Sequence, residues 1–144
     1  METVLLQLFR GAGIQGLSGM PLVIDFGLGQ MIRPFLDVSK QAINAYAALH
    51  QIHWVEDPSN QSDNFDRNFL RNQIFPQLKQ RWPALDKTVA RSARHCANSQ
   101  VISQGLAVQL LHDLHTESDK ALDIVGLLAL EWNQQQLVVR QWFA

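Results

Sequence analysis

Two neighbouring segments, Glu56-Asp57-Pro58-Ser59-Asn60 and Asp66-Arg67-Asn68-Phe69-Leu70-Arg71, divide the chain of 144 residues into two kinds of sequence. Before them, short extended patterns alternate with helical ones, and after them only helical periodicity is found. The proline, serine, asparagine and aspartate residues of the stretch favour a loop, and Asp66 suits the N-cap of the helix that follows. The sequence therefore predicts an α/β part followed by an all-α part, mostly α overall.

The chain begins with an apolar segment and a glycine-rich loop. Residues 2–9 are apolar nearly all round, which predicts a helix that packs on both sides. Arg10 and Gly11 end this helix, because a base suits the last turn and a glycine suits the residue beyond it. Residues 11–19 contain four glycines and can bring backbone N–H groups close to a phosphate. A flexible connection is the alternative, since the Lys-Ser/Thr ending of a nucleotide P-loop is absent.

Extended patterns and a helix follow this loop. Residues 21–24 and 31–33 predict a small hairpin or a pair of edge strands around a Gly-Leu-Gly turn. Ser39 is placed to cap a helix over residues 40–50. Residues 53–55 have the composition of a short strand. A strand, a helix and a second strand in this order are typical of an open α/β sheet.

From residue 67 onward the apolar periodicity predicts helices only. The predicted elements are a short helix interrupted near Pro76, a second helix ending near Trp82, a long helix over 83–114, a loop over 116–120, an apolar run over 122–125 and a final helix capped by Asn133.

The net charge of −1 conceals a strong partition along the chain. Residues 1–64 carry three basic and six acidic side chains, residues 65–95 seven and two, and residues 96–144 two and five. The seven basic residues are Arg67, Arg71, Lys79, Arg81, Lys87, Arg91 and Arg94. A basic segment between acidic flanks suits a polyanion such as nucleic acid, although a solvated helix face is the alternative.

Several functional classes lack the residues that they need. The single cysteine, Cys96, excludes a disulfide framework and fits a reducing cytoplasm. No uncharged apolar run approaches the roughly 20 residues of a membrane helix. The pairs His50/His53 and His112/His115 have no third ligand at metal-site spacing, so no metal site is predicted from them.

Arg67 and Arg71 are separated by four residues and project from the same side of a helix. Two guanidinium groups can hold a phosphate or a carboxylate in a bidentate manner. Glu56 and Asp57 lie just before them and are candidates to pair with them. A salt-bridge cluster between two domains is therefore the alternative to an anion-binding site.

Further segments carry a resemblance: Glu2-Thr3-Val4-Leu5-Leu6, Arg10-Gly11-Ala12-Gly13, Gly16-Leu17, Ile32-Arg33-Pro34 and Trp54-Val55. Together with the two segments quoted first, they resemble the tRNA(Ile)-lysidine synthetase family of the PP-loop ATP pyrophosphatase superfamily. The resemblance is good over residues 2–100 and looser beyond. It implies that residues 1–75 are the C-terminal part of a Rossmann-like catalytic domain and that residues 76–144 are a helical tRNA-binding domain.

In that family, ATP adenylates C2 of the wobble cytidine of tRNA(Ile), and the amine of free lysine then displaces AMP to give lysidine. The resemblance implies a cytoplasmic, non-membrane ligase that uses ATP and Mg²⁺ and acts on the anticodon region of tRNA(Ile). Two alternatives stay open, a non-catalytic helical RNA-binding adaptor and a related PP-loop tRNA thiolase, although a lone cysteine disfavours the thiolase. The apolar first helix also leaves a homodimer open.

The resemblance assigns roles to individual residues. The expected catalytic residues are Glu2, Arg67 and Arg71, with Glu2 as a candidate Mg²⁺ contact. The expected ATP- or substrate-binding residues are Arg10, Gly11, Gly13 and Asn68. The expected tRNA-binding residues are Lys79, Arg81, Lys87, Arg91 and Arg94. The Ser-Gly-Gly-x-Asp-Ser loop and the His-His segment of the family are absent, so we expect a fragment that is inactive alone.

Overall fold

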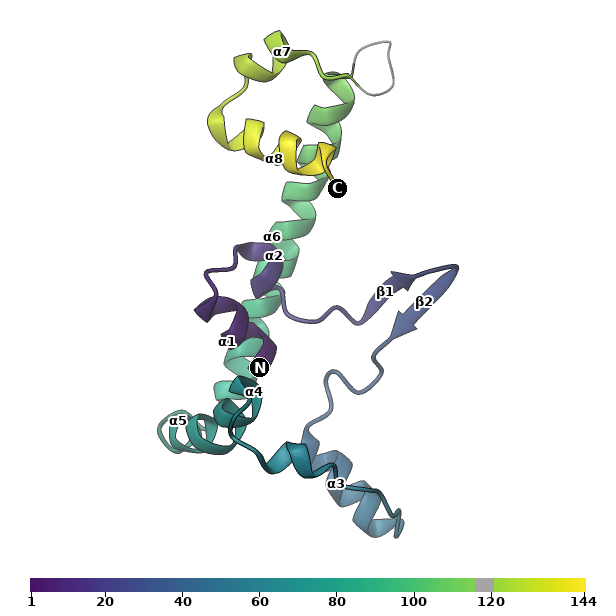
Figure 1. Ribbon diagram of the computed structural model, residues 1–144, viewed down its shortest axis with the longest axis vertical. Coiled ribbons are helices and arrows are strands. Elements are labelled where there is room, and N and C mark those ends of the chain that lie inside the picture. The colour runs from purple at the N-terminus through teal and green to yellow at the C-terminus, as the bar shows by residue number, and fades with distance from the viewer. Residues whose placement is uncertain (116–120) are drawn as a thin grey trace.

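The computed structural model describes residues 1–115 and 121–144, which form a mostly helical chain with a single two-stranded sheet (Figure 1). The helices are α1 (Glu2–Phe9), α2 (Ile14–Leu17), α3 (Lys40–Leu49), α4 (Asp66–Phe69), α5 (Phe75–Arg81), α6 (Leu85–Asp113), α7 (Ile124–Ala129) and α8 (Trp132–Trp142). A 3-10 turn, η1 (Pro58–Gln61), precedes α4, and a π-helical segment, η2 (Leu70–Ile74), joins α4 to α5. Strands β1 (Val23–Phe26) and β2 (Gly29–Ile32) pair antiparallel.

Helix α6 is the long axis of the molecule (Figure 1). Its 29 residues include one glycine and no proline, so it runs uninterrupted for about 43 Å. The short helix α2 packs against it, and α8 folds back along its C-terminal half (Figure 1). The hairpin and α3 extend away from this axis. Within the described ranges, no helix combines the length and the apolar character needed to cross a membrane.

Two glycines with positive φ angles flank α2, the short helix that packs against α6. Gly11 and Gly19 have φ angles of +70° and +73°, a conformation that favours glycine. A Cβ atom added at Gly19 would lie 3.4 Å from Cγ2 of Val4 and 3.7 Å from Cβ of Ala93. Gly19 therefore supplies both the left-handed turn and the close approach that bring the glycine-rich loop against α6.

The buried side chains lie in separate small groups. Leu70 and Phe75 are buried where α4, η2 and α5 meet, and Leu114 and Val138 are buried near the packing of α8 on α6. The first group joins consecutive elements, whereas the second joins α8 to the more distant α6, and isolated short helices such as α8 are marginal in water. The position of α8 is thus set by packing on α6 rather than by helix propensity.

Several sequence predictions are confirmed. Helix α1 has the predicted bounds, and the hairpin pairs Val23 with Ile32. Ser39 caps α3, with its Oγ accepting a hydrogen bond of 3.1 Å from the backbone N–H of Ala42. The long helix is present, although it begins at Leu85 rather than at Pro83.

The predicted strand over 53–55 is wrong, and the described residues do not confirm an open α/β sheet. These residues belong to no strand, and β1 pairs only with β2 in the described part of the chain. A strand needs a neighbour for its backbone groups, and a suitable composition does not supply one. The expectation that α1 packs on both sides is also wrong, because Leu8 and Phe9 are 52% and 67% exposed.

Three helix boundaries also differ from prediction. Pro76 interrupts nothing, because it occupies the first turn of α5, where an N–H group is dispensable, directly after the π-helical segment. Asp66 is the first residue of α4, and Phe65 is its N-cap. The final helix is capped by Glu131, which forms a capping box with Gln134, rather than by Asn133.

The apolar run over 122–125 leads into a helix that the sequence analysis missed. Asp123 caps α7, its Oδ1 accepting a hydrogen bond of 3.0 Å from the N–H of Val125. The predicted loop over 116–120 lies outside the described residues.

We predict that Val138→Ala lowers the free energy of unfolding by about 2 kcal/mol, because it removes two buried methyl groups from the contact between α6 and α8. Val138 is fully buried, whereas its neighbour Val139 is 37% exposed. Val139→Ala is the matched control and should change stability by only about 0.5 kcal/mol. Chemical denaturation measures both, and equal effects of the two substitutions would contradict the packing of α8.

Candidate functional site

Glu2, at the start of α1, and Arg71, in η2, form a bidentate ion pair. Nε of Arg71 donates to Oε1 of Glu2 at 2.7 Å, and Nη2 of Arg71 donates to Oε2 at 2.9 Å. The side chain of Arg71 is 34% exposed and that of Glu2 is 24% exposed, so water only partly screens the pair. The hydrogen bonds to Glu2 raise the pKa of Arg71 above its usual value, against the opposing effect of burial. The two hydrogen bonds hold the guanidinium group of Arg71 in one orientation.

Local structure explains why these groups meet. Glu2 lies in the first turn of α1, where a carboxylate is favoured by the helix dipole. Arg71 lies on the π-helical segment η2, and α1 packs against α4. Arg67, on α4, approaches the same carboxylate, with 3.8 Å between its Nε and Oε2 of Glu2. The structure thus brings together the three expected catalytic residues.

Arg67 differs from Arg71 in its freedom. Its side chain is 56% exposed and its distance to Glu2 is longer than a hydrogen bond. More than half of the Arg67 side chain is therefore open to solvent. Glu2 is the acidic partner of both arginines, so the expectation that Glu56 and Asp57 pair with them is wrong for the residues described.

Asn68 fastens the preceding loop rather than facing Glu2. Its side-chain amide donates to the carbonyl oxygens of Ser59 and Ser62 at 2.8 and 2.9 Å, and the residue is buried. Asp57 further orders this loop by accepting a hydrogen bond of 2.9 Å from the N–H of Ser59, which lowers the pKa of Asp57. An Asx-type turn followed by a buried amide thus fixes the loop against α4.

Asp63 adds a second fastening that the sequence analysis did not single out. Its two carboxylate oxygens accept hydrogen bonds from the amides of Asn72 and Gln73, at 2.8 and 2.7 Å. These bonds, that of Asn72 foremost, lower the pKa of Asp63. The only sequence signal was an aspartate followed by consecutive amides one helix later.

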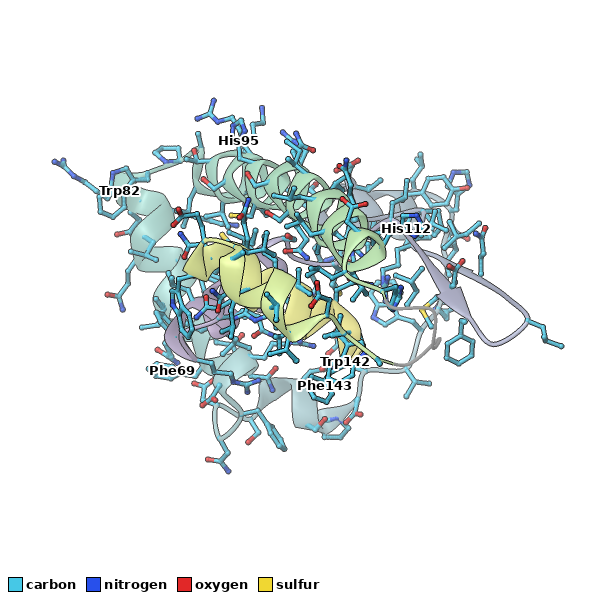
Figure 2. The ribbon with its side chains drawn as sticks, turned by 90° about the horizontal axis from the view of Figure 1, so that it is seen from above. Phe69, Trp82, His95, His112, Trp142 and Phe143 are labelled. Carbon is cyan, nitrogen blue, oxygen red and sulfur yellow. The ribbon has the colours of Figure 1, made fainter. Side chains whose placement is uncertain are left out.

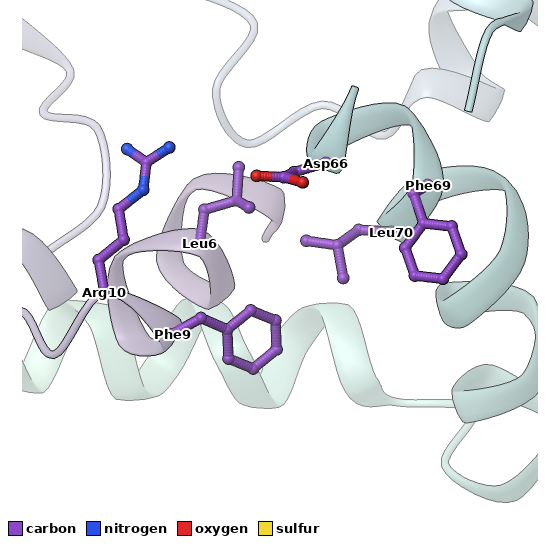
Figure 3. Close-up of a pocket in the computed structure, with 6 residues that line it drawn as sticks. All are labelled: Leu6, Phe9, Arg10, Asp66, Phe69 and Leu70. Carbon is purple, nitrogen blue, oxygen red and sulfur yellow. The ribbon is translucent and has the colours of Figure 1, made fainter. Parts of the chain in front are cut away.

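A groove of about 380 Å³ lies between α1 and the segment formed by α4 and η2 (Figure 3). It has an apolar lining with one cationic and one anionic side chain, and the lining residues are Leu6, Phe9, Arg10, Asp66, Phe69 and Leu70. Arg10 belongs to the C-terminal end of α1, about 12 Å along the axis from Glu2. The expected binding residue Arg10 therefore lines this groove and is not part of the Glu2 cluster.

The glycine-rich loop offers open backbone. Gly11 follows the end of α1, and Gly13 is the N-cap of α2. A Cβ atom added at either position would meet no protein atom within 4 Å. Neither glycine is needed for packing, although the positive φ angle of Gly11 still favours glycine.

The predicted tRNA-binding residues divide into two groups. Lys87, Arg91 and Arg94 lie on one face of α6, opposite the buried Ala93 and Ala107, and we call these three residues the basic stripe. Figure 2 shows His95, next to Arg94, on the side of α6 that faces away from α8. Outside the stripe, Lys79 is bound to Asp86 at 2.6 Å and Arg81 ends α5. The described residues contain no cluster of metal-ligating side chains.

Comparison with known proteins places this arrangement in a defined class. Residues 1–78 match the family model of the PP-loop domain, and the chain therefore belongs to the PP-loop family. Curated relatives named tRNA(Ile)-lysidine synthase match almost the whole chain. The relative from Edwardsiella ictaluri (strain 93-146) is 44% identical over 99% of this chain and 32% of its own length. The relative from Serratia proteamaculans (strain 568) is 45% identical over 99% of this chain and 33% of its own length.

These matches confirm the family resemblance drawn from the sequence. The chain spans about a third of the length of the curated relatives that it matches.

Proposed function

We propose that this chain supplies a section of the catalytic and tRNA-binding surfaces of a tRNA(Ile)-lysidine synthase. In this reaction ATP adenylates C2 of the wobble cytidine with release of pyrophosphate, and the amine of free lysine then displaces AMP. The observation that carries the proposal is that Glu2, Arg67 and Arg71 lie together in the structure. The relatives that match almost the whole chain are named tRNA(Ile)-lysidine synthase.

In this proposal the three residues of the cluster have different tasks. Arg71 donates hydrogen bonds from its Nε and Nη2 to Glu2, so it positions the N-terminal turn of α1. Arg67 keeps exposed donors and would bind the negative charge of the activated intermediate. Arg10 and the open backbone of Gly11 and Gly13 would contact ATP or substrate from the groove side. Asn68 would act indirectly, through the loop that it holds.

The residues described do not form a site for Mg²⁺. Both oxygens of Glu2 accept hydrogen bonds from Arg71, and no group of three or more metal-ligating side chains forms within the described ranges. A magnesium ion needs carboxylate or other oxygen ligands that are free to coordinate it. No step of the proposed reaction is therefore assigned to a metal held by these residues.

The remaining parts of the proposal concern partners and domains. The basic stripe would contact phosphates of tRNA(Ile), with Arg81 and Lys79 beside it, and free lysine would be the second substrate. The division into residues 1–75 and 76–144 stays a prediction, as does a homodimer. A non-catalytic RNA-binding adaptor is the second candidate, because the basic stripe alone would suffice for it.

A chimeric enzyme tests the catalytic proposal. In the Serratia proteamaculans relative, the matched third is replaced by this chain, and incorporation of labelled lysine into a tRNA(Ile) transcript is measured. We expect Arg71→Ala in the chimera to lower incorporation about 100-fold, because misplacement of a catalytic group has an effect of this size. Arg140→Ala, at the exposed end of α8, is the control and should leave the rate unchanged. We expect the isolated chain to form no lysidine.

Two results would contradict the catalytic proposal. Unchanged turnover in folded Arg71→Ala would show that the ion pair is only a structural tether. A thiolated cytidine in place of the lysine-bearing product would assign the chain to a thiolase instead.

The salt dependence of tRNA binding tests the basic stripe. We expect Arg91→Gln to weaken the binding of a tRNA(Ile) transcript and to reduce the slope of log K against log salt concentration by about 1, since one phosphate contact is lost. Lys40→Gln, on the distant helix α3, is the matched control and should leave the slope unchanged. Binding that is insensitive to salt would exclude a phosphate-contacting face.

A further inference from the structure

Trp82 exposes an indole ring within the one net-basic segment of the chain. The residue is 55% exposed and lies at the junction of α5 and α6, at the periphery of the molecule (Figure 2). The exposed Trp54 and Trp132 each lie within two residues of an acidic side chain, and the exposed Trp142 lies in the net-acidic segment 96–144, whereas Trp82 directly follows Arg81. Burial in the fold therefore does not account for this large aromatic side chain in a basic segment.

The backbone around Trp82 is held in place. Its N–H donates to the carbonyl of Leu78 at 2.8 Å, and its carbonyl accepts from the N–H of Leu85 at 3.0 Å. Pro83 disfavours a helical conformation at the preceding residue, and Trp82 accordingly has φ −127° and ψ 83°. The backbone that carries the indole ring is therefore fixed at the point where α5 ends.

An ion pair also links α5 to α6 at this junction. Nζ of Lys79, in the last turn of α5, lies 2.6 Å from Oδ2 of Asp86, in the first turn of α6. This contact neutralises Asp86, which is the only acidic residue from position 67 to position 95. Arg81 and the basic stripe have no acidic partner within ion-pair distance among the residues that the structure describes. Anions near Trp82 therefore meet an uncompensated positive surface.

We propose that Trp82 stacks on an unpaired base of a single-stranded RNA segment whose phosphates contact Arg81 and the basic stripe. The inference rests on the proposed tRNA-binding function and adds the residue that engages a base. Aromatic stacking beside a basic groove is the general means by which proteins hold single strands, and a tryptophan loses little side-chain entropy on binding. The Cα atoms of Trp82 and Lys87 lie at most about 18 Å apart, so one short strand can reach both.

The test compares two probes on this chain, a labelled oligouridine and an abasic ribose-phosphate oligomer of the same length. We expect Trp82→Ala to weaken oligouridine binding about tenfold while leaving abasic binding and the salt slope unchanged, since only a base can stack. Trp82→Phe keeps a ring and should retain most of the affinity. Trp82→Leu keeps an apolar side chain without a ring and should behave as Trp82→Ala does, which separates stacking from a general effect on folding.

Other outcomes overturn the proposal in distinguishable ways. Equal affinity of Trp82→Ala and the unchanged chain for oligouridine would exclude stacking and leave a protein partner for the exposed ring. An equal loss on both probes would assign Trp82 a purely structural effect. If Arg91→Gln weakens binding in either case, the RNA-binding function stands while the role of Trp82 fails. If neither probe binds the unchanged chain, both proposals fail.

Discussion

The ion pair between Glu2 and Arg71 is the contact on which the arrangement of the first half of the chain depends. It joins residues that are 69 positions apart through two short hydrogen bonds. Helix α1 is short and has several exposed apolar side chains, so neither propensity nor burial alone fixes where it begins. A charged, bidentate contact supplies direction as well as stability, because the guanidinium plane admits few orientations of its partner. The pair thereby sets the position of Arg67 and the shape of the groove beside Arg10.

The rest of the structure supports this contact from the opposite side. The π-helical segment carries Arg71, while the amides of Asn68, Asn72 and Gln73 bind the preceding loop. Single π-helical turns are frequent at functional sites, and here the turn contains Arg71 and directly follows the helix that carries Arg67. On helix α6, the exposed side chains of the basic stripe continue the positive charge away from this cluster. In our proposal, the Glu2 cluster would bind a small anion and the long helix would bind an extended one.

The elements that local signals determine are predictable from the sequence. The bounds of α1, the hairpin and the Ser39 cap follow from residues within a few positions of each other. The spacing of Arg67 and Arg71 correctly predicted that they share a side of the helix. Their acidic partner was missed by spacing, which favoured the nearby Glu56 and Asp57, since pairing across 69 residues leaves no local pattern. The false strand at 53–55 has the same origin, because local composition cannot show whether a partner strand exists. Pro76 was misjudged because its effect depends on which turn of a helix it occupies.

A double-mutant cycle on Glu2 and Arg71 tests the central claim most directly. The free energy of unfolding is measured for the unchanged chain, Glu2→Gln, Arg71→Gln and the double variant, with Arg67→Gln as the reference partner. A bidentate and partly buried pair predicts a coupling of about 1 kcal/mol at low salt, with a smaller coupling between Glu2 and the more exposed Arg67. A coupling near zero for Glu2 and Arg71, or an equal one for both arginines, would contradict the account.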